Sequence, residues 1–209
     1  KTIGYQHAVI GSQQFNPGPA SNPDGLNSIP DRIIFSGPAY FEQLVSWGMP
    51  KERMIIGGAF RIAKFEENLF DPKGPIFVAA SSDTDITRKL MLAVNKAQRE
   101  GRKFIVKVHP LYPKEITETG NIKITNKTIP AQKGISAVFY GTGTSGLEGM
   151  LARVPTFRLR PDDQVAINVL PNGVDPVWSI GQNGKYDVVT LTGHARGSED
   201  YLGAASVNH

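Results

Sequence analysis

The stretch that decides the fold is Ser136-Ala137-Val138-Phe139-Tyr140-Gly141-Thr142-Gly143-Thr144-Ser145-Gly146-Leu147-Glu148. An apolar run is followed by a turn with three glycines, and a helical pattern begins at Ser145. This order predicts a buried strand, a tight turn and a helix start. Glycines allow a sharp backbone path that leaves amide groups uncovered, and the hydroxyl side chains lie where the amino end of a helix carries partial positive charge. A phosphate group fits such a turn.

The same residues have a plainer interpretation as a helix start. Ser145 and Glu148 have the S-x-x-E spacing of a capping box, in which the serine caps the helix and the glutamate reaches back to the serine amide. No lysine follows the last glycine, so the pattern is not a Walker loop, and Leu147 departs from the dinucleotide-binding fingerprint. The cap and a ligand role are not exclusive, and both stay open.

Composition indicates an ordinary globular α/β chain. Of the 209 residues, 40% are hydrophobic and 20% are charged, which is typical of a chain that buries one core. The formal net charge of +4 favours anionic ligands, but it is far from that of a nucleic-acid-binding arm. The absence of cysteine excludes disulfides, thiolate metal sites and cysteine nucleophiles.

No run of 18 apolar residues and no charged-then-apolar leader occurs in the sequence. We therefore expect no membrane span and a cytoplasmic location, with peripheral attachment to the inner face of the membrane as the alternative. The sequence begins at Lys1 without methionine. We expect the chain to be part of a longer protein.

Apolar runs alternate with helical patterns along most of the chain, which predicts parallel βαβ units and a doubly wound, mostly parallel sheet. Helices are expected over 38–47, 85–100 and 145–152, with Leu90, Leu92, Val94 and Ala97 inward on the second. Strands are expected over 2–10, 32–35, 53–56, 76–80, 104–108, 122–125, 136–140, 155–159 and 186–191, and a further helix over 165–170. Residues 1–30, rich in Gly, Pro and Asn after residue 10, are interpreted as the end of a preceding domain or a linker, 31–163 as one domain, and 164–209 as a carboxyl-terminal extension.

Three of the expected strands end in polar groups suited to an anion. These groups are Ser81-Ser82, His109-Pro110, and Thr142 to Ser145. In doubly wound sheets ligands bind outside the carboxyl ends of the strands, so we expect the three segments to share one ligand. A histidine donor together with hydroxyls and amides at helix starts would neutralise a phosphate without a metal or other cofactor. Ser82 or Asp83 could equally cap the next helix.

These residues resemble a family. Ser81-Ser82, Lys107-Val108-His109-Pro110 and the turn from Gly141 to Glu148 are similar to the donor-binding, Rossmann-like half of glycosyltransferases of the GT-B architecture. The resemblance is greatest to bacterial sialyltransferases, polysialyltransferases and capsule enzymes, and it covers about residues 30 to 160. It implies that the chain binds a nucleotide sugar, with a CMP-activated acidic sugar favoured, in the biosynthesis of surface polysaccharide.

The resemblance also assigns roles to single residues. His109 would hold the phosphate and stabilise the leaving group, and Glu148 would reach a ribose hydroxyl. Arg61 would pair with a donor carboxylate. The other contacts would come from Ser81, Ser82, Pro110, Gly143, Thr144 and Ser145. The family's D/E-D-G acid-base motif does not occur here, so we expect the general base and the glycan acceptor site to lie in a missing amino-terminal domain.

Three alternatives remain. Sugar-nucleotide 2-epimerases acting on UDP-GlcNAc-type substrates have the same architecture and a similar glycine and serine turn. Transferases that use a CDP-linked polyol phosphate also resemble the His-Pro pattern. A non-catalytic nucleotide or RNA-binding module would use the basic residues on and after one helix. These basic residues are Arg88, Lys89, Lys96, Arg99, Arg102 and Lys103. No aromatic residues lie between them to stack on bases. A solvated helix face is therefore the simpler interpretation, and no nucleic-acid partner is expected.

Overall fold

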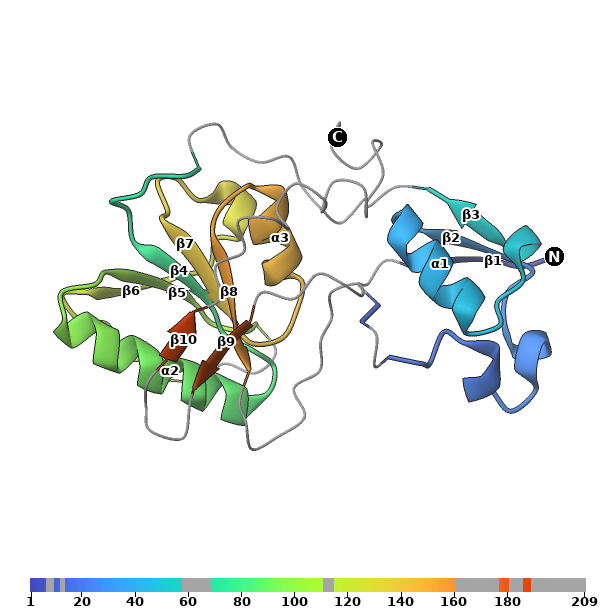
Figure 1. The fold of residues 1–209 in the computed structure, drawn as a ribbon, viewed down its shortest axis with the longest axis horizontal. Coiled ribbons are helices and arrows are strands. Elements are labelled where there is room, and N and C mark those ends of the chain that lie inside the picture. Colours follow the sequence, from blue (N-terminus) through green and yellow to red (C-terminus); the bar gives the residue numbers. More distant parts are fainter. Residues whose placement is uncertain are drawn as a thin grey trace. The chain divides into compact units, whose positions relative to one another are not determined.

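The computed structural model describes residues 1–6, 10–11, 14–57, 69–110, 115–160, 177–180 and 186–188 (Figure 1). The chain divides into two compact units. The described residues up to Gly57 belong to the first unit and those from Leu69 onward belong to the second. Among the described residues, no helix is both long enough and apolar enough to cross a membrane.

In its described residues, the first unit has a parallel three-stranded sheet and one α-helix. Its strands are β1 (Ile3–Gln6), β2 (Arg32–Phe35) and β3 (Met54–Ile56), in the order β1-β2-β3. Helix α1 (Pro38–Ser46) joins β2 to β3 and ends before Gly48, whose φ of +88° suits glycine. Tyr40 and Leu44 of α1 are buried in the core of this unit. Burial raises the pKa of the Tyr40 hydroxyl, which therefore stays protonated.

The segment before β2 is part of this unit. It contains two short 3-10 helices, η1 (Pro19–Ser21) and η2 (Gly25–Ser28). The guanidinium of Arg53 donates to the Leu26 carbonyl at 2.7 Å, and the rings of Phe15 and Trp47 lie 5.0 Å apart. Strand β1, which lies within the expected segment 1–30, pairs with β2 at the start of the expected 31–163 domain. The two compact units divide between Lys64 and Phe65, a point within the expected 31–163 domain.

The second unit contains a seven-stranded sheet in the order β10-β9-β8-β7-β4-β5-β6. Every pair of neighbouring strands is parallel except β9 and β10. From β4 the chain adds β5 and β6 on one side, then returns to add β7, β8 and β9 on the other. This doubly wound order confirms the predicted α/β, Rossmann-like fold. The bounds are β4 (Ile76–Ala79), β5 (Phe104–Lys107), β6 (Ile122–Thr125), β7 (Ala137–Tyr140), β8 (Thr156–Arg160), β9 (Val177–Ile180) and β10 (Tyr186–Val188).

Helices α2 (Thr84–Arg99) and α3 (Ser145–Leu151) cover opposite faces of this sheet (Figure 1). Successive residues of β7 point to opposite faces. Phe139 packs in the cluster that contains Leu90 of α2, whereas Val138 lies against Gly149 of α3. A short 3-10 helix, η4 (Ile129–Ala131), precedes β7. One hydrophobic core of this unit therefore lies between α2 and strands β4 to β8.

Two sequence expectations need correction in this unit. Leu92, expected inward, is 56% exposed. The inward stripe of α2 runs through Leu90, Ala93, Val94 and Ala97, and a residue two positions from Leu90 lies on the far side of a helix with 3.6 residues per turn. Strand β9 was not expected, whereas β10 lies within the expected strand over 186–191. The helix expected over 165–170 falls outside the described residues.

The two leucines of α2 offer a matched test of the core. Leu90 is 0% exposed and Leu92 is 56% exposed. Leu90→Ala should lower the free energy of unfolding by about 2–5 kcal/mol because it leaves a cavity against β4 and β5. Leu92→Ala should change it by less than about 0.5 kcal/mol. Urea unfolding followed by circular dichroism measures both; equal losses would contradict the orientation of α2.

Candidate functional site

The carboxyl ends of β4, β5 and β7 form the candidate site. These strands are adjacent in the sheet, with β4 between the other two. Ala79 of β4 pairs with Lys107 of β5 on one side and with Tyr140 of β7 on the other, so the three strands end level. Because the strands are parallel, the polar segments that follow them emerge at one edge. The order of the strands along the chain reverses between β4 and β7, which makes this edge the topological switch point of the sheet.

Ser81 joins the turn after β4 to the turn after β7. Its hydroxyl forms a short hydrogen bond with the hydroxyl of Thr142. It also accepts from the amide of Asp83 at 3.0 Å. Thr87 holds the Ser81 backbone, accepting from its amide at 2.9 Å and donating to its carbonyl at 3.0 Å. Ser81 is only 3% exposed. The buried Ser81 side chain therefore holds the two turns together, whereas the neighbouring Ser82 is exposed.

The carboxylates at the start of α2 have structural partners. Asp83 is the N-cap, and its side chain accepts from the amides of Asp85 and Ile86 at 2.9 and 3.1 Å. Asp85 pairs with Arg88 at 2.6 Å and with Lys89 at 3.1 Å. The hydrogen bond from Arg88, followed by that from Lys89, holds the pKa of Asp85 below its usual range. Both residues are thus helix-start carboxylates, as the sequence indicated, and the amino end of α2 is capped.

The basic residues of and after α2 divide by exposure. Lys89 lies against Asp85, and its side chain is only 11% exposed. The rest of the set is exposed, namely Arg88, Lys96, Arg99, Arg102 and Lys103. The prediction that these basic side chains form a solvated helix face therefore holds for the five exposed residues, but not for Lys89.

The helix after the glycine turn begins differently from the expected capping box. Thr144 is the N-cap of α3, its side chain makes no cap hydrogen bond, and Ser145 is the first helical residue. Glu148 is therefore the fourth residue of the helix, whereas the glutamate of a capping box is the third. Gly143 has a φ of +112°, which favours glycine. In contrast to α2, α3 starts without a side-chain cap.

Packing explains the other two glycines of the turn. A methyl group on Gly141 would overlap with Cγ2 of Ile86 in α2. A methyl group on Gly146 would overlap with the ring of Tyr140, which is buried beneath the first turn of α3. The absence of side chains at these positions lets both helices approach the turn closely. The motif that suggested a phosphate site is therefore also needed by the fold.

The remaining expected site residues lie around this turn. His109 is half-buried and Pro110 is exposed, directly after β5. Thr142, Gly143, Thr144, Ser145 and Glu148 are half-buried. Arg61 lies outside the described residues. No group of three or more His, Asp or Glu side chains that could hold a metal ion occurs in the described part of the chain.

Sequence reasoning missed two residues that shape the site. Thr87 has no sequence signal, because a threonine in the first turn of a helix commonly faces solvent. Tyr140 had a weak one, since a large aromatic residue directly before a glycine turn needs a small residue to pack against.

Comparisons with known proteins gave matches only among solved structures; no family model and no curated protein matches the chain. The chain is similar to UDP-GlcNAc 2-epimerase from Methanocaldococcus jannaschii, solved in complex with UDP-GlcNAc and UDP, with a TM-score of 0.56 and 15% identity over 88% of this chain. It spans 59% of that protein. The epimerase from Rickettsia bellii matches 76% of this chain and 49% of its own, with 15% identity and a TM-score of 0.47. The first likeness shows a shared fold.

Substitution of Gly141 tests whether its packing role is required. Gly141→Ala should lower the free energy of unfolding by about 1–3 kcal/mol because of the overlap with Ile86. Gly120→Ala is the matched control, since a methyl group there meets nothing within 4 Å. It should be neutral, or stabilising by up to about 1 kcal/mol. Chemical denaturation measures both; a neutral Gly141→Ala would contradict the close approach of α2.

A double-mutant cycle tests the bond between Ser81 and Thr142. Ser81→Ala and Thr142→Val should each lower the free energy of unfolding by about 1–3 kcal/mol, since each leaves a part-buried hydroxyl without its partner. The double variant should cost less than the sum of the two single variants, because it leaves neither hydroxyl behind. Additive losses would show that the hydroxyls act independently.

Proposed function

We propose that the second unit binds the nucleotide part of a nucleotide-activated sugar at the carboxyl ends of β4, β5 and β7. The observation that carries this proposal is the reversal of strand order between β4 and β7. Open doubly wound sheets bind their ligands in the crevice at such a point. Here the turn with Gly143 follows β7 and His109 follows β5, so both lie at this edge of the sheet.

In this proposal the phosphate lies over the turn after β7. Gly143, Thr144 and Ser145 bring amides and hydroxyls to the start of α3, which has no side-chain cap. His109 reaches the phosphate from the end of β5, and Ser82 reaches it from the end of β4. Ser81 and Thr142 hold the two turns together beneath it. Glu148 and Arg61 keep their proposed contacts to a ribose hydroxyl and to a donor carboxylate, and no metal or other cofactor takes part.

These groups suit a reaction in which the nucleotide departs. Negative charge grows on the leaving nucleotide in the transition state, and preorganised donors aimed at that charge lower the barrier. Both sugar transfer and epimerisation of a nucleotide sugar place such donors around the phosphates. The described residues around the turn supply the donors, while Asp83 and Asp85 are bound to their own helix. We therefore propose that the general base lies elsewhere in the protein and that this chain alone binds without turnover.

A UDP-linked sugar is our first candidate ligand. The Methanocaldococcus epimerase, which shares the fold, is in complex with UDP-GlcNAc and UDP. A CMP-activated acidic sugar is the second candidate, in a glycosyltransferase of surface polysaccharide biosynthesis with a glycan acceptor. Its support is the His109-Pro110 and Ser81-Ser82 pattern. Because the likeness to the epimerase is one of fold, the nucleotide base must be decided by experiment.

A thermal-shift screen against UDP, CMP, CDP and GDP tests the proposal. The preferred nucleotide should raise the melting temperature, because at about 100 times its Kd it adds about 2.7 kcal/mol to the stability of the folded state. His109→Ala should weaken binding about tenfold through the loss of one hydrogen bond to a charged group.

Asn126→Ala is the matched control for that variant. Asn126 follows β6 at the same edge of the sheet and is exposed, but β5 separates β6 from the switch point. Its replacement should leave binding unchanged. If no nucleotide raises the melting temperature, or if His109→Ala and Asn126→Ala weaken nucleotide binding equally, the proposed site is wrong. Detectable turnover by the chain alone would refute the proposal that the general base lies elsewhere in the protein.

A further inference from the structure

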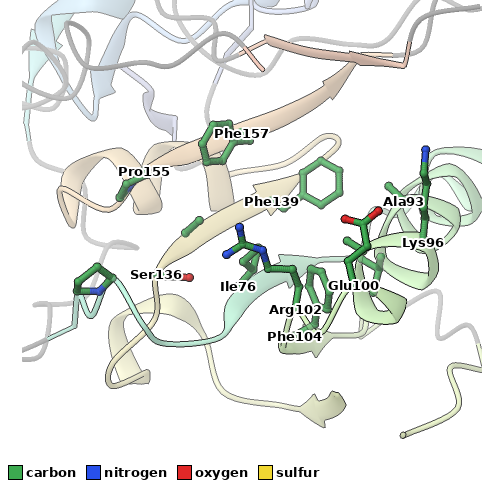
Figure 2. A pocket seen from close by; sticks show the side chains of 14 residues that line it. Ile76, Ala93, Lys96, Glu100, Arg102, Phe104, Ser136, Phe139, Pro155 and Phe157 are labelled. Carbon is green, nitrogen blue, oxygen red and sulfur yellow. The ribbon is translucent and has the colours of Figure 1, made fainter. Parts of the chain in front are cut away.

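A cavity lies on the face of the same sheet that α2 covers. It has a volume of about 590 Å³, which is within the range of small-molecule sites. Its floor is formed by Ile76 and Phe104, the first residues of β4 and β5, and by Phe139 of β7, with Phe157 of β8 beside them (Figure 2). The carboxyl-terminal half of α2 forms one wall through Ala93 and Ala97. None of the described residues of the proposed nucleotide site lines this cavity.

The arrangement of the fold explains why this cavity exists. Helix α2 packs over the part of the sheet that contains β4 and β5. The side chains of Phe139 and Phe157 point to the same face, because these residues pair in register on β7 and β8. Within the described residues, α2 is the only α-helix on this face, and the cavity lies between its carboxyl-terminal half and the two phenylalanines. An apolar surface is thus left beside the helix.

The mouth of the cavity carries charge. Lys96, Glu100 and Arg102 line it together with the Ser136 hydroxyl. Glu100 follows Lys96 by four positions on α2, where opposite charges balance. Arg102 lies beyond the end of the helix, so the lining has an excess of one positive charge. Figure 2 shows the Arg102 guanidinium directed across the mouth toward Ser136, away from the Lys96 amine.

We infer that this cavity binds a small amphiphilic organic anion. The apolar body would lie on Ile76, Ala97 and Phe157, and its carboxylate or phosphate would pair with Arg102 at the mouth. Ile76, Ala97 and Phe157 are half-buried, so they retain apolar surface that a bound chain could cover and remove from water. The guanidinium offers paired donors to a carboxylate or phosphate, which a neutral head group cannot use equally well.

Calorimetric titration with three probes of equal chain length tests this inference. Octanoate, 1-octanol and octylammonium differ chiefly in the charge of the head group. Octanoate should bind about fivefold more tightly than octanol, the effect expected of one exposed ion pair. Octylammonium should bind more weakly than both. Equal affinity for all three, or binding of none, would overturn the inference.

Three variants locate the site. Ala97→Phe should reduce the affinity for octanoate and for octanol at least tenfold by filling the cavity. Arg102→Gln, a surface change that spares the core, should reduce the affinity for octanoate about fivefold and leave that for octanol unchanged. Arg99→Gln is the matched control, since Arg99 is exposed and does not line the cavity; it should change neither.

The two sites can be separated in the same experiment. Nucleotide stabilisation should be unaffected by Ala97→Phe, so failure at one site does not imply failure at the other. Circular dichroism establishes whether that variant folds, and Arg102→Gln decides the question if it does not. Octanoate binding that is insensitive to both Ala97→Phe and Arg102→Gln would overturn the inference.

Discussion

The parallel ladder between β4 and β7 is the contact on which the second unit depends. It joins Ile76 to Ala137 at one end and Ala79 to Tyr140 at the other. Just beyond the ladder, Ser81 and Thr142 are bonded although 61 positions separate them in the chain. Contacts between residues so distant require the closure of a long loop, so they must be stabilised by burial. Every residue of β7 is buried, and the switch point exists because of this pairing.

Two glycines of the turn after β7 are required by the packing of the fold, whether or not a ligand binds there. Gly141 admits Ile86 of α2, and Gly146 admits the ring of Tyr140 beneath α3. The two helices therefore reach the turn from opposite faces of the sheet. Their starts differ, because Asp83 caps α2 while α3 has no side-chain cap. The glycine pattern alone does not identify a phosphate site; its position at the switch point and the uncapped helix start support one.

The sequence predicted the central strands β4, β5 and β7 within one residue because each is an apolar run, and β7 is buried on both faces. The bounds of α2 followed from Asp83 at its start and Gly101 at its end, whose φ is +84°. The division after Lys64 was not apparent from the sequence, because β1 pairs with β2 across a segment whose composition indicates a loop. Strand β9 is short and is stabilised by its neighbours in the sheet, a context that no local pattern reveals.

The candidate site was predictable in placement and not in detail. Three polar segments after three apolar runs implied one edge of a parallel sheet, and β7, β4 and β5 are indeed adjacent. The role of Ser81 could not be inferred, because its bond to Thr142 depends on the turn that each strand makes. The cavity was not foreseen either. It depends on which face of β7 and β8 lies beside α2, which only the packing of the elements decides.

One short strand links the two ends of this sheet. Strand β7 has four residues and spans about 13 Å. Phe139 faces the cavity, and Tyr140 packs beneath α3 on the other face, directly before Gly141. Helix α2 is shared as well, since its amino end borders the turn through Asp83 and Ile86 while its carboxyl-terminal half lines the cavity. Strand β7 and helix α2 therefore border both the proposed nucleotide site and the cavity. Any coupling between them must be reciprocal.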